Sequence, residues 1–78
     1  MSRARMAPEN DRDTARLALQ VLEELIQYQQ RRVLELANRI HPGLTDEDVR
    51  NPHDFPDLFE DTAWQYEDGQ LAGLVSAL

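Results

Sequence analysis

Residues 10–43 read NDRDTARLALQVLEELIQYQQRRVLELANRIHPG, with neither glycine nor proline before Pro42. Apolar residues in this run recur at alternating steps of four and three, which is the spacing of a heptad seam along an α-helix. Further apolar residues beside the seam make the stripe broad enough for a helical bundle. We therefore predict an amphipathic helix over about residues 10–41, roughly 45 Å long at about 1.5 Å per residue. The seam contains Ala15, Leu19, Leu22, Ile26, Gln29, Val33, Leu36 and Ile40, and its flanks add Ala18, Leu25 and Ala37.

Both ends of this helix carry residues that suit a helix boundary. Asn10 and Asp11 offer side-chain caps, and Asp13 places negative charge in the first turn. The sequence His41-Pro42-Gly43 ends the helix, because proline cannot continue the hydrogen-bond ladder and glycine permits a turn. Residues 1–9 show no periodicity and are predicted to be a mobile tail.

The second half of the chain predicts short helices followed by a longer one. After a turn at residues 42–44, Thr45 is expected to cap the first of several short helices within residues 45–60. Two prolines in that segment predict a bent elbow. A final helix is expected over about residues 62–77, opened by a capping box of Thr62 and Gln65, or else starting nearer Tyr66.

These elements predict an all-α fold in which short helices fold back on the long helix as a helical hairpin. Residues 10–78 form a single helical domain, and a chain of this size buries only about two thirds of the surface that its unfolded form exposes. The sequence has no cysteine, so disulfides cannot supply the missing stability. Association or close helix packing must supply it.

The difference in helix lengths predicts dimerisation, which would complete a helical bundle. A final helix of about 16 residues covers only about 24 Å of the long apolar stripe. A monomer rarely leaves a large contiguous apolar patch in water, so we expect a second copy to cover the remainder. The predicted oligomer interface consists of Leu19, Leu22, Ile26, Gln29, Val33 and Leu36.

Two features of this pattern suggest specific packing. Gln29 interrupts the apolar seam, where one polar residue can set register and oligomer state; the alternative is that it lies at an exposed edge. Gly69 and Gly73, four residues apart, suggest close approach of another helix, unless Gly69 precedes the final helix.

The net charge of −7 is unevenly distributed. Residues 1–43 hold seven arginines and six acidic residues, whereas residues 44–78 hold one arginine and nine acidic residues. The two halves thus carry +1 and −8. This balance disfavours direct binding to nucleic acid or an anionic membrane and is compatible with a basic protein partner, or simply with a solvated surface.

No pattern of catalytic or metal-binding residues is found. His41 and His53 lie near several aspartates, but their spacing matches no helical or loop pair of metal ligands. No cysteine is present, and no serine has a histidine close in sequence. We therefore predict no catalytic residue, no cofactor and no metal site. The aromatic residues are expected to pack the elbow onto the long helix, or in part to bind a partner: Phe55, Phe59, Trp64 and Tyr66.

The sequence favours a small non-catalytic interaction or scaffold module that acts through helix association, most simply as a homodimer. The alternative is an acidic regulatory protein that masks a basic partner, such as a nucleic-acid-binding protein; an enzyme or metal carrier ranks third. No apolar run approaches the roughly 20 residues of a membrane span, and the first residues lack the apolar stretch of a signal peptide. A cytoplasmic location is therefore expected.

Overall fold

The fold is all-helical. The structure is a computed structural model that describes the backbone of residues 2–78 and the side chains of residues 11–78. No strand occurs within residues 2–78, and none of the helices there is long and apolar enough to span a membrane. The prediction of one long helix followed by shorter ones is confirmed. The helices are α1 (Ser2–Ile40), α2 (Asp46–Val49), the 3₁₀ helix η1 (Pro52–Asp54), α3 (Pro56–Phe59) and α4 (Thr62–Ser76).

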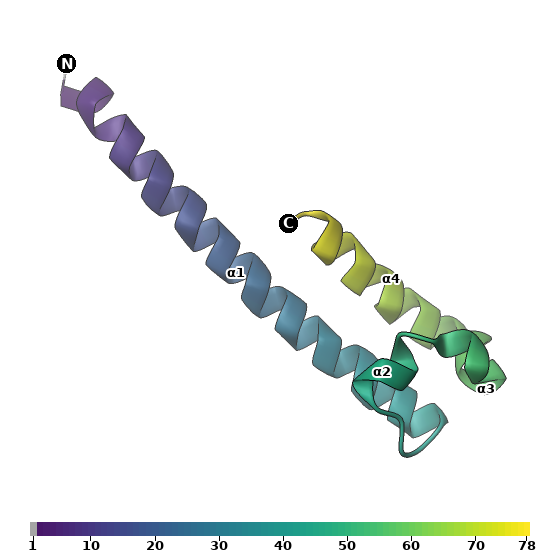
Figure 1. Cartoon of the computed structure of the whole chain (residues 1–78). Helices are drawn as coiled ribbons and strands as arrows, with labels where there is room; N and C mark the ends of the chain where they lie inside the picture. The colour runs from purple at the N-terminus through teal and green to yellow at the C-terminus, as the bar shows by residue number, and fades with distance from the viewer. Residues whose placement is uncertain (1) are drawn as a thin grey trace.

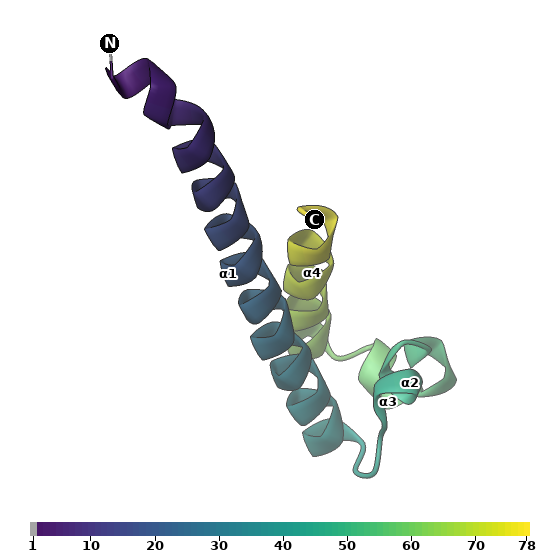
Figure 2. The same cartoon turned by 60° about the vertical axis from the view of Figure 1, so that its left-hand side comes forward.

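The chain doubles back once, so that α4 lies beside the second half of α1 and runs antiparallel to it (Figure 1). The short helices α2 and α3 lie at the closed end, near the last turns of α1 (Figure 2). The first half of α1 extends beyond the end of α4 in both views. The molecule is consequently elongated, measuring 61 × 18 × 16 Å along its principal axes.

Helix α1 begins at Ser2, eight residues before the predicted start near residue 10. The segment before residue 10 contains alanine, arginine, methionine and glutamate, which all favour helix. Pro8 lies inside the helix, although it cannot donate a backbone hydrogen bond. The side chains of residues 1–10 lie outside the described residues, and the mobility expected for residues 1–9 stays a prediction.

The turn after α1 is held by Asn38, a residue that the sequence analysis did not identify. Its Oδ1 accepts hydrogen bonds from the backbone N–H groups of Gly43 (2.9 Å) and Leu44 (3.0 Å). Its Nδ2 donates to the carbonyl oxygens of Leu34 and Leu44, each at 3.0 Å. Gly43 has a φ of +92°, a conformation that glycine adopts without steric cost. One amide side chain thereby provides hydrogen-bond partners for several backbone groups of the turn.

The predicted cap of α2 is confirmed, and the predicted cap of α4 is wrong. The Thr45 hydroxyl accepts from the backbone N–H of Asp48 (3.3 Å), and the Asp48 carboxylate accepts from the backbone N–H of Thr45 (3.0 Å). At α4 the N-cap is Asp61, whose Oδ1 accepts from the Trp64 backbone N–H at 2.8 Å, while Thr62 is the first helical residue. A carboxylate outcompetes a hydroxyl at this position because it is a charged and stronger acceptor.

The hydrophobic core lies at the closed end of the hairpin, around Trp64 and Leu58. Trp64 is buried and Phe55 packs against the core, as predicted for the aromatic residues, but Phe59 and Tyr66 are exposed. The Trp64 indole N–H has no acceptor among the described residues, which offsets part of the stabilisation from burying the ring. The core consists of Val33, Ala37, Leu44, Leu58 and Trp64.

Leu58→Ala should lower the free energy of unfolding by about 2–5 kcal/mol, because the change leaves a cavity where a fully enclosed side chain stood. Leu58 is 0% exposed, whereas the neighbouring Phe59 is 48% exposed. Phe59→Ala is therefore the matched control, with an expected loss of about 1 kcal/mol or less. Urea denaturation at one fixed protein concentration measures both. Equal losses in the two variants would contradict the position of the core at Leu58.

Candidate functional site

Helix α4 covers much of the seam that was predicted to form the oligomer interface. The seam turns toward α4 because its spacing places it along one side of α1. Near the closed end of the hairpin, the seam residues therefore pack against the other helices of the same chain. Toward the N-terminus, the seam is open to solvent. Ile26, Gln29 and Val33 are buried, Leu22 and Leu36 are half-buried, and Leu19 is exposed.

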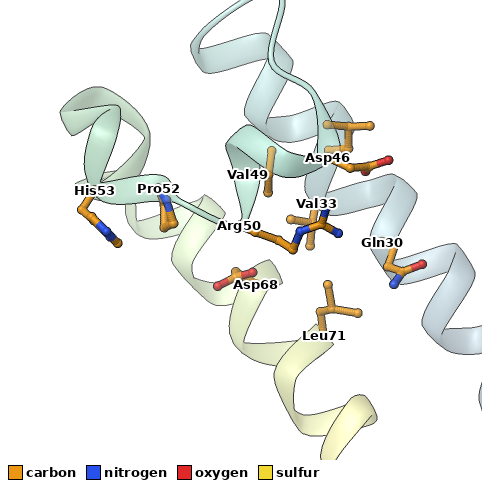
Figure 3. A pocket seen from close by; sticks show the side chains of 10 residues that line it. Gln30, Val33, Asp46, Val49, Arg50, Pro52, His53, Asp68 and Leu71 are labelled. Atoms are coloured by element: carbon orange, nitrogen blue, oxygen red, sulfur yellow. The ribbon is translucent and has the colours of Figure 1, made fainter.

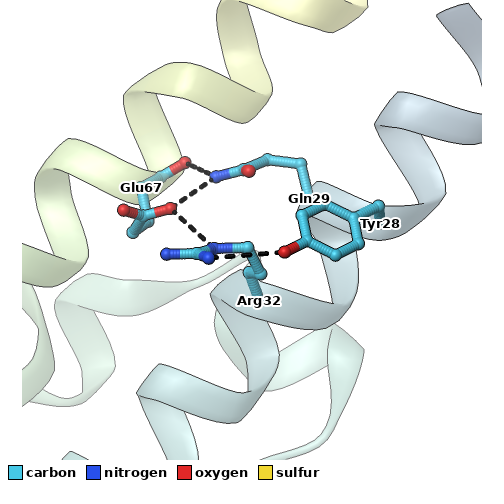
Figure 4. Close-up of polar contacts among 4 residues, drawn as sticks. All are labelled: Tyr28, Gln29, Arg32 and Glu67. Atoms are coloured by element: carbon cyan, nitrogen blue, oxygen red, sulfur yellow. Dashed lines mark hydrogen bonds and ion pairs between the residues drawn. The ribbon is translucent and has the colours of Figure 1, made fainter.

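Gln29 joins α1 to α4 through two hydrogen bonds to one residue (Figure 4). Its Nε2 donates to the Glu67 carbonyl oxygen at 2.8 Å and to Glu67 Oε1 at 2.9 Å. Arg32 Nε donates to the same Oε1 at 3.3 Å. The Arg32 guanidinium also lies 5.9 Å from the centre of the Tyr28 ring and donates to the Tyr28 hydroxyl at 3.5 Å. Hydrogen bonds thus connect Glu67 on α4, through Arg32, to Tyr28 on the outer side of α1.

Gln29 lies in the buried contact between α1 and α4, and a role in fixing their register stays a prediction. It is 8% exposed, so the alternative position at an exposed edge is wrong. The hydrogen bond from Gln29 is the main cause that lowers the pKa of Glu67; Arg32 lowers this pKa further, and partial burial opposes both. The pKa of Arg32 is raised, first by Tyr28 and then by Glu67. An effect of Gln29 on oligomer state stays a prediction.

A second apolar surface lies on α1 outside this packing, and we call Leu17, Val21, Leu25 and Tyr28 the outer stripe. Each of these side chains is about half exposed or more, from 47% at Leu25 to 61% at Leu17. Steps of four, four and three residues keep them on one face of the helix. That face lies about 120° around α1 from the residues that face α4, at about 100° per residue.

Most of the outer stripe is not predicted from the sequence, because the heptad spacing assigns the apolar residues of α1 to a single seam. Leu25 was recognised as a flank of that seam, and the other three members were not assigned to a surface. A helical-wheel count over residues 15–28 could have found the stripe, since apolar residues there occupy about 200° of the helix circumference. Such an arc is wider than the stripe of roughly 100° that is typical of an amphipathic helix on the surface of a globular protein.

A half-open cleft of about 650 Å³ lies between α1, α2 and α4 (Figure 3). Val33, Val49 and Leu71 form apolar parts of its lining, while Asp68 enters from α4 and Arg50 from the residue that caps the end of α2. Partial burial raises the pKa of Asp68. The polar part of the lining consists of amide, carboxylate, guanidinium and imidazole side chains.

The two histidines make separate local contacts. His41 Nδ1 lies 3.0 Å from Asp57 Oδ2, and this hydrogen bond is the main cause that lowers the pKa of Asp57. The His41 ring also meets Phe55 edge-on, with ring centres 5.1 Å apart. His53 contacts Phe59 in the same manner at 6.3 Å. Within residues 11–78, no three histidine or acidic side chains converge as ligands of a metal ion would.

The glycines of α4 do not contact another helix of the chain. A Cβ atom built at Gly69 or Gly73 would meet nothing within 4 Å, so close approach of α1 does not explain them. Gly69 also lies well inside α4 rather than before it. The two glycines instead line a shallow surface groove with Tyr66 and Leu74.

Comparison of the chain with protein-family models, curated proteins and solved structures found no match. Function is therefore inferred from the geometry of the described residues.

Gln29→Leu should make the stability of the protein less sensitive to acid. Glu67 has a lowered pKa in the folded protein, so its contribution is present above the ordinary value of 4.5 and is lost as pH falls through the folded value. Removing the Gln29 amide removes the main cause of that lowering. Between pH 7 and about pH 3, the thermal midpoint of the variant should therefore fall less than that of the native protein.

Gln27→Leu is the matched control, because Gln27 is exposed on the same helix and has no hydrogen bond to Glu67 in the described structure. It should keep the native pH dependence. Thermal denaturation followed by circular dichroism at several pH values measures all three proteins. An identical acid-side loss in native protein and Gln29→Leu would show that this hydrogen bond does not stabilise the fold.

Proposed function

We propose that the protein is a small non-catalytic interaction module that associates with a second copy of itself through the outer stripe of α1. The observation that carries this proposal is the exposure of four large apolar side chains along one continuous helix face, from Leu17 to Tyr28. A contiguous exposed apolar patch is typical of a protein interaction site. The proposed occupant of this patch is a second copy of the chain, because a symmetric contact between two copies needs no other component.

The uncovered length of α1 supports the same proposal. Residues 11–21 are all exposed, so this part of the helix gains little stability from packing within the chain. An isolated helix of about 12–15 residues is marginal in water, and most helices in proteins are stabilised by burial of an apolar face. Association through the outer stripe would bury that face and stabilise the extended half of α1.

The position of the outer stripe allows association without unfolding the hairpin. It lies about a third of a turn around α1 from the side that faces α4. A second α1 can therefore pack on the stripe while α4 keeps its contacts with Val33 and Gln29. Two copies would form a four-helix arrangement around a two-fold axis, in which the α1 helices are central. A rigid dimer of this kind suits a scaffold role.

A second candidate function is masking of a basic partner by the acidic half. Of the nine acidic residues in residues 44–78, Glu67 pairs with Arg32 and Asp57 hydrogen-bonds with His41, and the other seven form no ion pair within the described chain. Unpaired acidic side chains attract a basic partner at long range. A monomeric variant distinguishes the two functions, because it keeps the acidic half and loses the α1 interface.

Val21→Glu should convert a dimer into a monomer. Val21 is 52% exposed within the chain, so the change leaves the hairpin intact, whereas a carboxylate in an apolar dimer contact is costly to desolvate. Gln27→Glu adds the same charge on the solvent-facing side of α1 and should remain dimeric. Light scattering at micromolar concentration gives the masses, and circular dichroism checks that helicity is unchanged.

Two outcomes would contradict the proposal. A native protein with the mass of a monomer would show that the outer stripe does not bind a second copy. A dimeric and folded Val21→Glu variant would place the contact on another surface.

A further inference from the structure

We propose that two copies associate with their α1 helices antiparallel, so that Asp13 of each copy lies opposite Arg31 of the other. The inference rests on the proposed dimer and specifies its geometry. The two-fold axis would cross α1 near residues 22 and 23.

The outer stripe is complementary to itself when one copy is reversed. About such an axis, Leu17 faces Tyr28 of the second copy, and Val21 faces Leu25 of the second copy. These two pairs have nearly the same midpoint along the chain, 22.5 for the first and 23 for the second. The largest side chain thus meets a smaller one at each end of the contact. A parallel arrangement would instead place the two Tyr28 rings against each other.

The charges along one edge of the outer stripe follow the same symmetry. Asp13 and Arg31 are 18 residues apart, which is about five helical turns, so both lie on the same edge. Their midpoint is residue 22, within one residue of the midpoints of the stripe pairs. Neither side chain forms an ion pair within the described part of the chain. Both charges are therefore free to pair across a dimer contact.

Only the antiparallel orientation brings these opposite charges together. In an antiparallel helix pair like edges face each other, so two Asp13–Arg31 pairs form around the axis. In a parallel pair this edge would face the opposite edge of the stripe, where Ala18 and Leu25 lie. The parallel arrangement thus forms neither ion pair.

Repulsion between the acidic halves also favours the antiparallel arrangement. In each copy, residues 44–78 carry a charge of −8, and the short helices of this segment lie beside the last turns of α1 (Figure 2). A two-fold axis near residue 22 separates the two sets of short helices by about 40 Å along the dimer, at about 1.5 Å per residue. This distance is several times the Debye length of about 8 Å at physiological salt. A parallel dimer would hold both sets at the same end.

Disulfide cross-linking of introduced cysteines tests the orientation, because the native chain has no cysteine. In the antiparallel dimer, the two copies of residue 17 are about 16 Å apart along the axis, so Leu17→Cys alone should form no disulfide dimer. A mixture of Leu17→Cys and Tyr28→Cys should form a mixed disulfide, identified by its mass. Light scattering of the same reduced samples establishes whether each is a dimer before oxidation.

The outcomes separate the orientation from the dimer itself. Reduced samples of dimer mass with a Leu17→Cys homodisulfide would overturn the antiparallel arrangement and leave the proposed function standing. Dimeric samples with no mixed disulfide would overturn it as well. Native protein of monomer mass would remove the proposed function together with this inference.

Charge reversal provides an independent measurement of the Asp13–Arg31 pairs. Asp13→Arg and Arg31→Asp should each raise the Kd of the dimer roughly three- to tenfold, since each change affects two symmetry-related pairs. The double variant restores opposite charges and should return the Kd to within about twofold of the native value. Sedimentation equilibrium measures these constants. A double variant as weak as the single variants would overturn the proposed pairing.

Discussion

The difference in length between α1 and α4 constrains everything else in this protein. Helix α1 has 39 residues and α4 has 15, so one antiparallel neighbour can cover less than half of the long helix. Burial of an apolar face, rather than intrinsic propensity, supplies most of the stability of helices in proteins. The closed end of the hairpin obtains that burial from Trp64 and Leu58. The extended half of α1 has no equivalent cover among the described residues, and this is the physical basis for expecting association.

The contact between α1 and α4 combines apolar packing with hydrogen bonds from one polar side chain, that of Gln29. Val33 and Ala37 bury apolar surface that would tolerate a shift of α4 along α1. The Gln29 amide does not tolerate such a shift, because its two hydrogen bonds both end on Glu67. Moving α4 by one turn would leave a nearly buried amide without partners, which costs more than the hydrogen bonds gain. The polar residue therefore contributes specificity to a contact that apolar packing stabilises.

The sequence was sufficient where a local rule determined the local structure, and insufficient where two rules competed. Thr45 as the cap of α2 follows from backbone chemistry and is found as predicted. Asp61 and Thr62 are both good caps, and periodicity alone could not choose between them. Periodicity also identified the seam without revealing that α4 of the same chain covers it. That choice depends on where the short helices place α4, which is a tertiary property.

In the proposed dimer, folding and association would be coupled, because helix α1 takes part in both. The core at the closed end has five buried residues among those described, and a chain of this length is marginally stable because it buries a limited share of its surface. Anything that binds the folded state adds to its stability in proportion to the logarithm of its concentration. A second copy on the outer stripe would extend the buried surface to the half of α1 that α4 does not reach. In the proposed dimer, the elongated hairpin would be one subunit of a helical bundle.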